Sequence, residues 1–148
     1  MSQMNIVHQS LRPYRRGYLE ATQAIVSAMT PSSRLVMCHS WYTEEESRGQ
    51  AMFLIRWILI PMIRPVLDNM RETELWLEKE CEKDVNWTVV RPAGLTNNPR
   101  TDSEIKVEMD KFDVSAGAGR IARADVARFM LSSISEEKYY KKGVAIAV

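Results

Sequence analysis

The sequence predicts an α/β protein with a mostly parallel sheet and flanking helices. Two continuous apolar runs, Leu35–Cys38 and Trp87–Val90, have the pattern of strands that are buried on both faces, as in parallel sheets. A helical pattern precedes the first run, and a long amphipathic helix lies between the two. This alternation of helices and buried strands is typical of the α/β class.

Length, charge and cysteine content restrict the protein classes. A chain of 148 residues fits one domain that is large enough to have a core without disulfides. The formal net charge of +1 gives no basic surface for nucleic acid. Cys38 and Cys81 could form one disulfide, but two thiols in a reducing compartment are the favoured interpretation, which places the protein in the cytoplasm.

The first third of the chain predicts one helix, one strand and irregular segments around them. Met1–Arg16 is polar, and we expect a leader there that precedes the domain proper at residues 17–148. Apolar residues at helical spacing predict a helix over Tyr18–Met29, which Pro31 ends. The polar stretch His39–Gln50, after the first strand, should be a loop.

The middle third predicts two helices separated by prolines. Ala51–Ile63 is the most hydrophobic stretch, but its 13 residues include Arg56 and are too few to span a bilayer. An amphipathic helix on a surface is its alternative interpretation, although we expect no membrane partner. Pro61 and Pro65 should break or kink this helix. A second helix, Val66–Glu82, is amphipathic. Its expected apolar face is Leu67, Met70, Leu75, Trp76 and Leu77, and its expected solvated face is Asp68, Arg71, Glu72, Glu78 and Lys79.

The segment after the second strand is the first candidate for ligand contact. Arg91-Pro92 stops the β-branched run, and glycine, asparagines and a second proline follow as far as Pro99. Proline cannot donate to a sheet ladder, so Pro92 should mark the end of the strand and the start of a long irregular loop. Ligands of open α/β sheets bind beyond the carboxyl ends of the strands.

The last third predicts a short strand, a helix and a final strand. Ile105–Met109 alternates strictly between apolar and polar residues, which indicates an edge or antiparallel strand. Ser115–Gly119 is glycine-rich but lacks the spacing of a phosphate-binding loop. A helix begins near Ala124-Asp125, and Gly143–Val148 should be a strand.

Three motifs resemble a known family. Cys38-His39-Ser40-Trp41, the run from Val89 to Thr96 (VVRPAGLT) and the run from Arg120 to Ala127 (RIARADVA) are together similar to the NAD(P)H-binding, NmrA-like branch of the atypical short-chain dehydrogenase/reductases. The nearest subgroup is the flavin reductase/biliverdin-IXβ reductase type. The resemblance covers about Tyr18–Tyr140 and implies a Rossmann-like fold.

The resemblance also implies a site. The strand Leu35–Cys38 would end beside the nicotinamide, and Ser40 would lie near the reacting hydride as the catalytic residue. NADP would be the cofactor, and Asp125 would cap the later helix. The cofactor contacts implied are Cys38, His39, Ser40, Pro92, Ala93, Gly94 and Leu95.

The chain departs from this family at its N-terminal end. A doubly wound nucleotide-binding sheet begins with a strand, a glycine-rich turn and a helix, whereas this chain begins with a helix. It therefore resembles the C-terminal two thirds of a reductase, an incomplete Rossmann-like sheet without the glycine-rich βαβ unit. An exposed sheet edge could then lead to self-association.

The candidate site residues keep alternative interpretations. Ser40 could simply be a turn residue, and Cys38 a small buried hydrophobe. His39 could be a general acid, but no carboxylate is evident beside it, so a solvated or partly packed loop histidine is favoured. Trp41 and Tyr42 could stack on a flat substrate or, preferentially, cover the sheet edge. Arg91 is expected to pair with a carboxylate. Two cysteines and two histidines show no metal-ligand spacing.

The function expected is NAD(P)H-dependent reduction of a flavin-like or tetrapyrrole-like small molecule. The cofactor would perform the hydride chemistry, and the protein would orient the rings. The alternatives are a catalytically inactive nucleotide-sensing or protein-interaction module and a fragment with no function of its own. Without a phosphate-binding turn, cofactor affinity should be low, and this feature separates the hypotheses.

Overall fold

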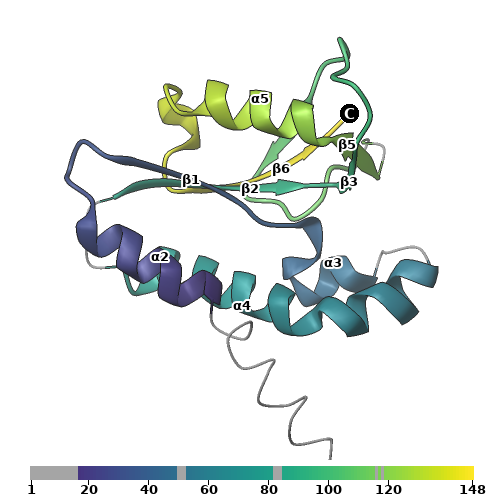
Figure 1. Cartoon of the computed structure of the whole chain (residues 1–148), viewed down its shortest axis with the longest axis horizontal. Helices are drawn as coiled ribbons and strands as arrows, with labels where there is room; N and C mark the ends of the chain where they lie inside the picture. Colours follow the sequence, from purple (N-terminus) through teal and green to yellow (C-terminus); the bar gives the residue numbers. More distant parts are fainter. Residues whose placement is uncertain (1–16, 50–52, 82–84, 116, 118) are drawn as a thin grey trace, which may run out of the picture.

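The computed structural model describes residues 17–49, 53–81, 85–115, 117 and 119–148, so the expected leader lies outside the described residues. A four-stranded sheet is covered by helices on both faces (Figure 1). Helix α5 (Arg123–Ser133) lies on one face, and α2 (Gly17–Ala28) and α4 (Ile60–Lys79) lie on the other. The predicted α/β class is confirmed.

The sheet has the order β1-β2-β6-β4. Strands β1 (Arg34–Cys38), β2 (Asn86–Pro92) and β6 (Lys142–Ala147) are parallel neighbours. Strand β4 (Lys106–Met109) pairs antiparallel with β6 at the edge, as its alternation predicted. The expectation of parallel first strands is also confirmed, since Cys38 pairs with Val90.

The expectation of a long irregular loop after Pro92 is wrong for the first residues of that segment. Pro92 does end β2, but β3 (Gly94–Thr96) follows at once and pairs in parallel with β5 (Arg120–Ala122). This pairing joins segments that are distant in the sequence, and a local pattern does not show such a partner. The adjoining Ala93 amide donates to the carbonyl of Ile146 at 3.1 Å, which ties the segment to the main sheet.

Of the break or kink predicted at Pro61 and Pro65, the break does not occur. A π-turn, η3 (Ile55–Leu59), runs directly into α4. Pro61 lies in the first turn of α4, directly after Ile60, whose amide still donates to the carbonyl of Ile55 in the π-turn. Pro65 lies inside the helix and removes one backbone hydrogen bond, but the helix continues across it to Lys79. The helix ends at Lys79, three residues before the expected end at Glu82, which itself lies outside the described residues.

The core forms two layers because successive strand residues point to opposite faces. Val89 packs with α2 and α4, whereas its neighbour Val90 packs with α5. Val89, Val90 and Val144 have no solvent exposure. The predicted loop after β1 is in part helical: it contains a 3₁₀ turn, η2 (Trp41–Thr43), and the short helix α3 (Glu45–Gly49). Among the described residues, no helix is long and apolar enough to cross a membrane.

Candidate functional site

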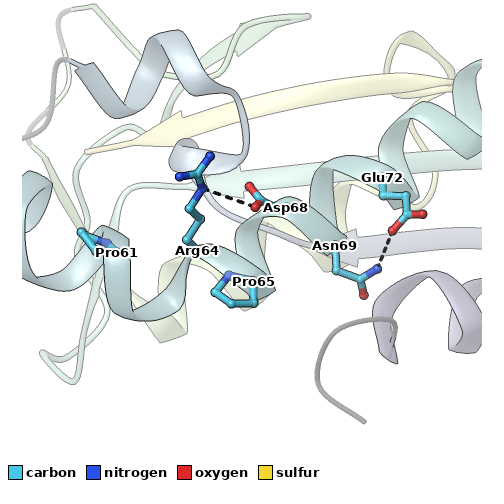
Figure 2. Close-up of a pocket in the computed structure, with 6 residues that line it drawn as sticks. All are labelled: Pro61, Arg64, Pro65, Asp68, Asn69 and Glu72. Atoms are coloured by element: carbon cyan, nitrogen blue, oxygen red, sulfur yellow. Dashed lines mark hydrogen bonds and ion pairs between the residues drawn. The ribbon is translucent and has the colours of Figure 1, made fainter. Parts of the chain in front are cut away.

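A first hollow lies along one side of α4 (Figure 2). It measures about 390 Å³ and is lined by Pro61, Arg64, Pro65, Asp68, Asn69 and Glu72. Its polar groups bind one another: Arg64 pairs with Asp68 at 3.6 Å, and the Asn69 amide donates to Glu72 at 3.2 Å (Figure 2). All these lining residues come from α4, so this hollow is not a place where several elements of the fold converge on a ligand.

A second hollow lies beyond the carboxyl ends of the parallel strands. It measures about 470 Å³, within the range of small-molecule sites. One wall follows β1, and the other comes from the loop that returns from β4 to β5. The lining residues are Trp41, Tyr42, Ser47, Ile55, Asp113, Val114, Ser115 and Gly119. This position is where ligands bind in open α/β sheets.

The segments after β1 and β2 lie at the same edge because the two strands are parallel. The Gly94 amide donates to the carbonyl of Gly119 at 3.1 Å, which connects the segment after β2 to the wall of the hollow. Pro92 and Ala93 are buried, whereas Gly94 and Leu95 are exposed. Of the expected cofactor contacts after β2, only the last two therefore present side-chain or Cα surface to solvent.

Ser40 is half-buried and has a local structural role. Its hydroxyl accepts a hydrogen bond of 3.4 Å from the Tyr42 amide and so caps the η2 turn. Trp41 is buried in the core next to α5, and Tyr42 is half-buried. Both aromatic side chains cover this end of the sheet and line the hollow. Burial raises the pKa of the Cys38 thiol, and burial and the Asp113 charge raise the pKa of Tyr42.

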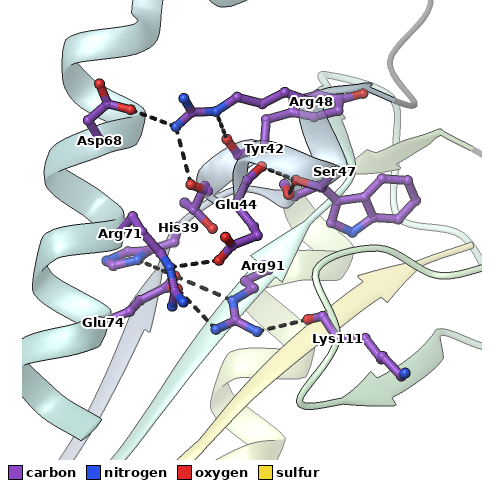
Figure 3. Close-up of polar contacts among 12 residues, drawn as sticks. His39, Tyr42, Glu44, Ser47, Arg48, Asp68, Arg71, Glu74, Arg91 and Lys111 are labelled. Carbon is purple, nitrogen blue, oxygen red and sulfur yellow. Dashed lines mark hydrogen bonds and ion pairs between the residues drawn. The ribbon is translucent and has the colours of Figure 1, made fainter. Parts of the chain in front are cut away.

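The expectation of a solvated or partly packed loop histidine with no carboxylate beside it is wrong. His39 is buried, and its Nδ1 lies 2.8 Å from Oε1 of Glu74 (Figure 3). An ionised carboxylate can only accept hydrogen bonds, so Nδ1–H of His39 is the donor in this contact. The other ring nitrogen, Nε2, takes no part in it. Nε2 is buried and has no hydrogen-bond partner among the described residues, and the Tyr18 ring meets the imidazole edge-on at 5.5 Å.

Glu74 is the centre of a buried charge cluster. Burial by itself would raise the pKa of this carboxyl group, but the His39 hydrogen bond and the charge and hydrogen bonds of Arg91 outweigh it and hold the pKa below its ordinary value. The Arg91 guanidinium donates to both carboxylate oxygens of Glu74, from Nε to Oε1 at 3.3 Å and from Nη2 to Oε2 at 3.0 Å. The expected pairing of Arg91 with a carboxylate is therefore confirmed. A second cation, Arg71, lies 3.5 Å from Glu74.

Arg91 connects three parts of the chain. Its guanidinium donates to the carbonyl of Lys111 at 2.8 Å and lies 3.9 Å from the centre of the Phe112 ring. Gly143 leaves room for it, since a Cβ there would overlap the guanidinium. The cluster therefore joins α4, β2, the residue after β1 and the loop after β4 (Figure 3).

Arg48 fixes the segment between β1 and α3. It donates to the carbonyls of Tyr42 and Thr43 at 2.9 and 3.2 Å and pairs with Asp68 at 2.7 Å. A parallel contact joins Arg71 to Glu44 at 2.8 Å (Figure 3). The wall that carries Trp41 and Tyr42 is thus tied to α4 at several points.

Sequence reasoning missed Glu74, although a signal was present. Glu74 follows Met70 by four residues and precedes Leu77 by three, so it lies on the apolar face of α4. An acidic residue on such a face, with an arginine in a buried strand, indicates a buried pair.

Asn69 and Thr73 of α4 are also buried, and Leu75 and Trp76, expected on the apolar face, are half-buried. The wall residues Asp113 and Ser115 had no local signal.

The expected capping role of Asp125 is also wrong. The residue that precedes α5 is Ala122, whose side chain makes no capping bond. Asp125 instead accepts the Thr101 amide at 3.1 and 3.3 Å and pairs with Arg128 at 3.1 Å. It holds the segment after β3 against α5.

The described residues are better suited to bind a flat ring at one end of a dinucleotide than to bind the pyrophosphate at its centre. The hollow offers aromatic walls at a strand edge, which suits a flat ring. Helix α5 follows β5 through Ala122-Arg123, without the glycine-rich turn that cradles a pyrophosphate. No group of three or more histidine, cysteine or acidic side chains that could hold a metal ion occurs in the described part of the chain.

A sequence-family comparison gives one match. The model of the NAD(P)H-binding family matches residues 2–137. A comparison with curated protein sequences gives no match.

Solved structures support the same fold at low sequence identity. A candidate NADH-flavin reductase from Streptococcus pneumoniae is 12% identical with a TM-score of 0.69, over 92% of this chain and 65% of that one. ChuY, an anaerobillin reductase from Escherichia coli, is 16% identical with a TM-score of 0.55, over 78% and 50%. A short-chain dehydrogenase/reductase from Veillonella parvula, solved with NADP, is 11% identical with a TM-score of 0.56, over 76% and 49%. The chain therefore spans about half to two thirds of the length of these proteins.

Proposed function

This chain belongs to the NAD(P)H-binding family, and on that premise we propose that it forms the nicotinamide-side part of an NAD(P)H-dependent reductase. The substrate class proposed is a flat conjugated ring system of the flavin or tetrapyrrole type. The observation that carries the proposal is the hollow of about 470 Å³ beyond β1 and β2, with Trp41 and Tyr42 in one wall.

The proposed roles follow from position. Trp41 and Tyr42 would provide flat apolar surface for the substrate ring, and Ser40 would lie beside the reacting carbon with its hydroxyl available as a donor. The backbone of Pro92–Leu95 would contact the nicotinamide end of the cofactor. The cofactor supplies the hydride when bound. The chain orients the rings and excludes water from them.

The Glu74 cluster supports these roles by rigidity. The carboxylate holds His39 directly before Ser40, and it holds Arg91 directly before Pro92. One buried side chain thereby fixes both segments proposed to meet the cofactor. Groups held in place before binding lose less entropy when the complex forms.

NADP is the cofactor proposed, by the resemblance of the motifs and with the support of the NADP complex of one structural neighbour. The cytoplasm is the proposed compartment. Cys38 and Cys81 are both thiols, as expected of a protein from a reducing environment.

Calorimetric titration with NADPH, together with a flavin-reduction assay, tests the proposal. We expect the 148-residue chain to bind NADPH with a Kd no better than roughly 0.1–1 mM, since a pyrophosphate cradle supplies much of the affinity and the described residues form none. A longer chain that begins with a strand, a glycine-rich turn and a helix should bind more tightly and reduce flavin.

Two results would redirect the proposal. Micromolar binding by the 148-residue chain would mean that another surface replaces the glycine-rich turn. An inactive longer chain would favour the alternative function, a nucleotide-sensing or protein-interaction module without catalysis.

A further inference from the structure

An apolar ridge lies on the segment that leads into α4. Six large apolar side chains of this segment are exposed, by 40 to 74%. They are Phe53, Leu54, Trp57, Ile58, Leu59 and Met62. The segment projects beyond the end of the sheet (Figure 1). So many neighbouring exposed hydrophobic side chains mark an interaction surface on a folded protein.

The other side of the same segment already packs against the protein. Ile55, Ile60 and Ile63 join a cluster with Leu67 and Met70 of α4. The segment is therefore apolar on both sides, and only its inner side is satisfied within the described residues.

The charge of the segment is uniformly positive. Between Glu46 and Asp68 the sequence has no acidic residue and has three arginines, at positions 48, 56 and 64. Arg48 and Arg64 both contact Asp68, at 2.7 and 3.6 Å. Arg56 lies within the ridge itself, 5.9 Å from the Trp57 ring. An occupant that complements the ridge should thus be apolar with negative charge at its boundary.

A second copy of the chain complements the ridge poorly. In a two-fold interface the same patch lies on both sides, so Arg56 and Arg64 would face their own copies. Asp68, the first acidic residue after this stretch, already contacts Arg48 and Arg64 of its own copy, so the arginines of the two copies would outnumber the carboxylate that could pair with them. An anionic lipid surface supplies both features instead: acyl chains for the ridge and headgroup phosphates for the arginines. Tryptophan prefers this boundary between water and hydrocarbon.

We propose that the ridge binds an anionic lipid surface and lies in the plane of its headgroups. The short length of the apolar stretch suits an interfacial segment. This inference departs from the sequence-based expectation of no membrane partner, because the exposure of the ridge follows from the tertiary structure. It is independent of the proposed reductase activity.

Vesicle binding by the full chain tests the proposal. The protein is mixed with vesicles of phosphatidylcholine alone or with about one third phosphatidylserine, and the bound fraction is measured by co-sedimentation. We expect binding to the anionic vesicles and at least tenfold weaker binding to the neutral ones. Tryptophan fluorescence should shift to the blue on binding, since Trp57 is 63% exposed whereas Trp76 is half-buried and Trp41 and Trp87 are buried.

Matched variants separate the ridge from general effects. Phe53→Glu combined with Ile58→Glu should lower binding at least tenfold and leave the unfolding transition intact, because both side chains are exposed. Arg56→Gln should weaken anionic binding only. Leu131→Glu is the control: Leu131 is 70% exposed on α5, so the same chemical change there should leave binding unchanged.

Three outcomes would overturn the proposal. The first is no binding of the wild-type chain to either vesicle. The second is an equal loss of binding in Leu131→Glu. The third is a dimer, detected by sedimentation, that the ridge variant dissociates and that does not bind vesicles, which would assign the ridge to a second copy.

Discussion

His39 Nδ1 and Glu74 Oε1 lie 2.8 Å apart although the residues are separated by 35 positions, and both side chains are fully buried. The contact joins the end of β1 to the middle of α4. Arg91 of β2 holds the same carboxylate at 3.0 Å. A buried charge is tolerated when hydrogen bonds and an opposite charge compensate for lost hydration, and Glu74 has both.

Removal of the Glu74 charge should destabilise the fold strongly. Glu74→Gln leaves the buried Arg91 without its counter-ion, and breaking one side of a buried pair costs about 3–5 kcal/mol. Urea unfolding measures the loss. Glu78→Gln, on the exposed face of the same helix, should change stability by less than about 0.5 kcal/mol. Equal stability of the two variants would contradict the central role of Glu74.

The stability should depend on pH through Glu74. Its folded-state pKa lies below the ordinary value of 4.5, so the unfolded chain takes up this proton at a higher pH than the folded chain. The stabilisation is therefore complete above about pH 4.5 and is lost as the pH falls through the folded pKa. Denaturant unfolding gives the free energy of unfolding of wild type and Glu74→Gln between about pH 3 and 7. The two curves of this free energy against pH should converge at acid pH. Parallel curves would contradict this assignment.

Gly143→Ala should disturb the same cluster from β6. The added Cβ would overlap the Arg91 guanidinium, which cannot move freely because Glu74 and Lys111 hold it. Overpacking of this kind costs about 1–3 kcal/mol. Gly17→Ala is the control, since a Cβ there meets nothing within 4 Å. Thermal unfolding of both variants provides the comparison, and a neutral Gly143→Ala would show that Arg91 is free to shift.

Ser40→Ala separates the two interpretations of Ser40. Loss of the cap on the η2 turn should cost about 0.5–1 kcal/mol, because the bond is long and closes a single turn. In a longer chain that reduces flavin, loss of the Ser40 donor beside the reacting carbon should also lower kcat by about tenfold, or about 1.4 kcal/mol in the barrier, with little change in KM. Unchanged kcat would make Ser40 a turn residue only.

The free edge of β1 should cause weak self-association. Strand β1 is at the end of the sheet order, and within the described residues it has a partner on one side only. Unpaired strand edges join other chains. Sedimentation velocity should show a mass that rises with concentration, in wild type and Ile58→Glu alike. A monodisperse monomer at all concentrations would refute this expectation.

Much of the fold could be predicted because it follows from local pattern. The apolar run Leu35–Cys38 indicated a parallel strand and the alternating run Ile105–Met109 an edge or antiparallel strand, and both pairings are confirmed. The expected burial of the first strand on both faces is wrong: β1 is half-buried along its whole length, because it lies at the edge of the sheet and has one neighbour among the described strands. The proline after Arg91 marked the end of β2. The pairing of β3 with β5 could not be predicted, since three-residue strands have too few residues to show a period.

The sequence by itself determined the α/β class, the main strands and helices, and the motifs that indicate an NAD(P)H-binding protein. Tertiary structure alone decided that His39 and Arg91 share Glu74, that Trp41 and Tyr42 line a hollow, and that the segment before α4 has an exposed apolar side. The physical reason is that periodicity reports which face of an element is apolar. The atoms that meet that face come from distant parts of the chain, and their positions depend on how the whole sheet and its helices pack.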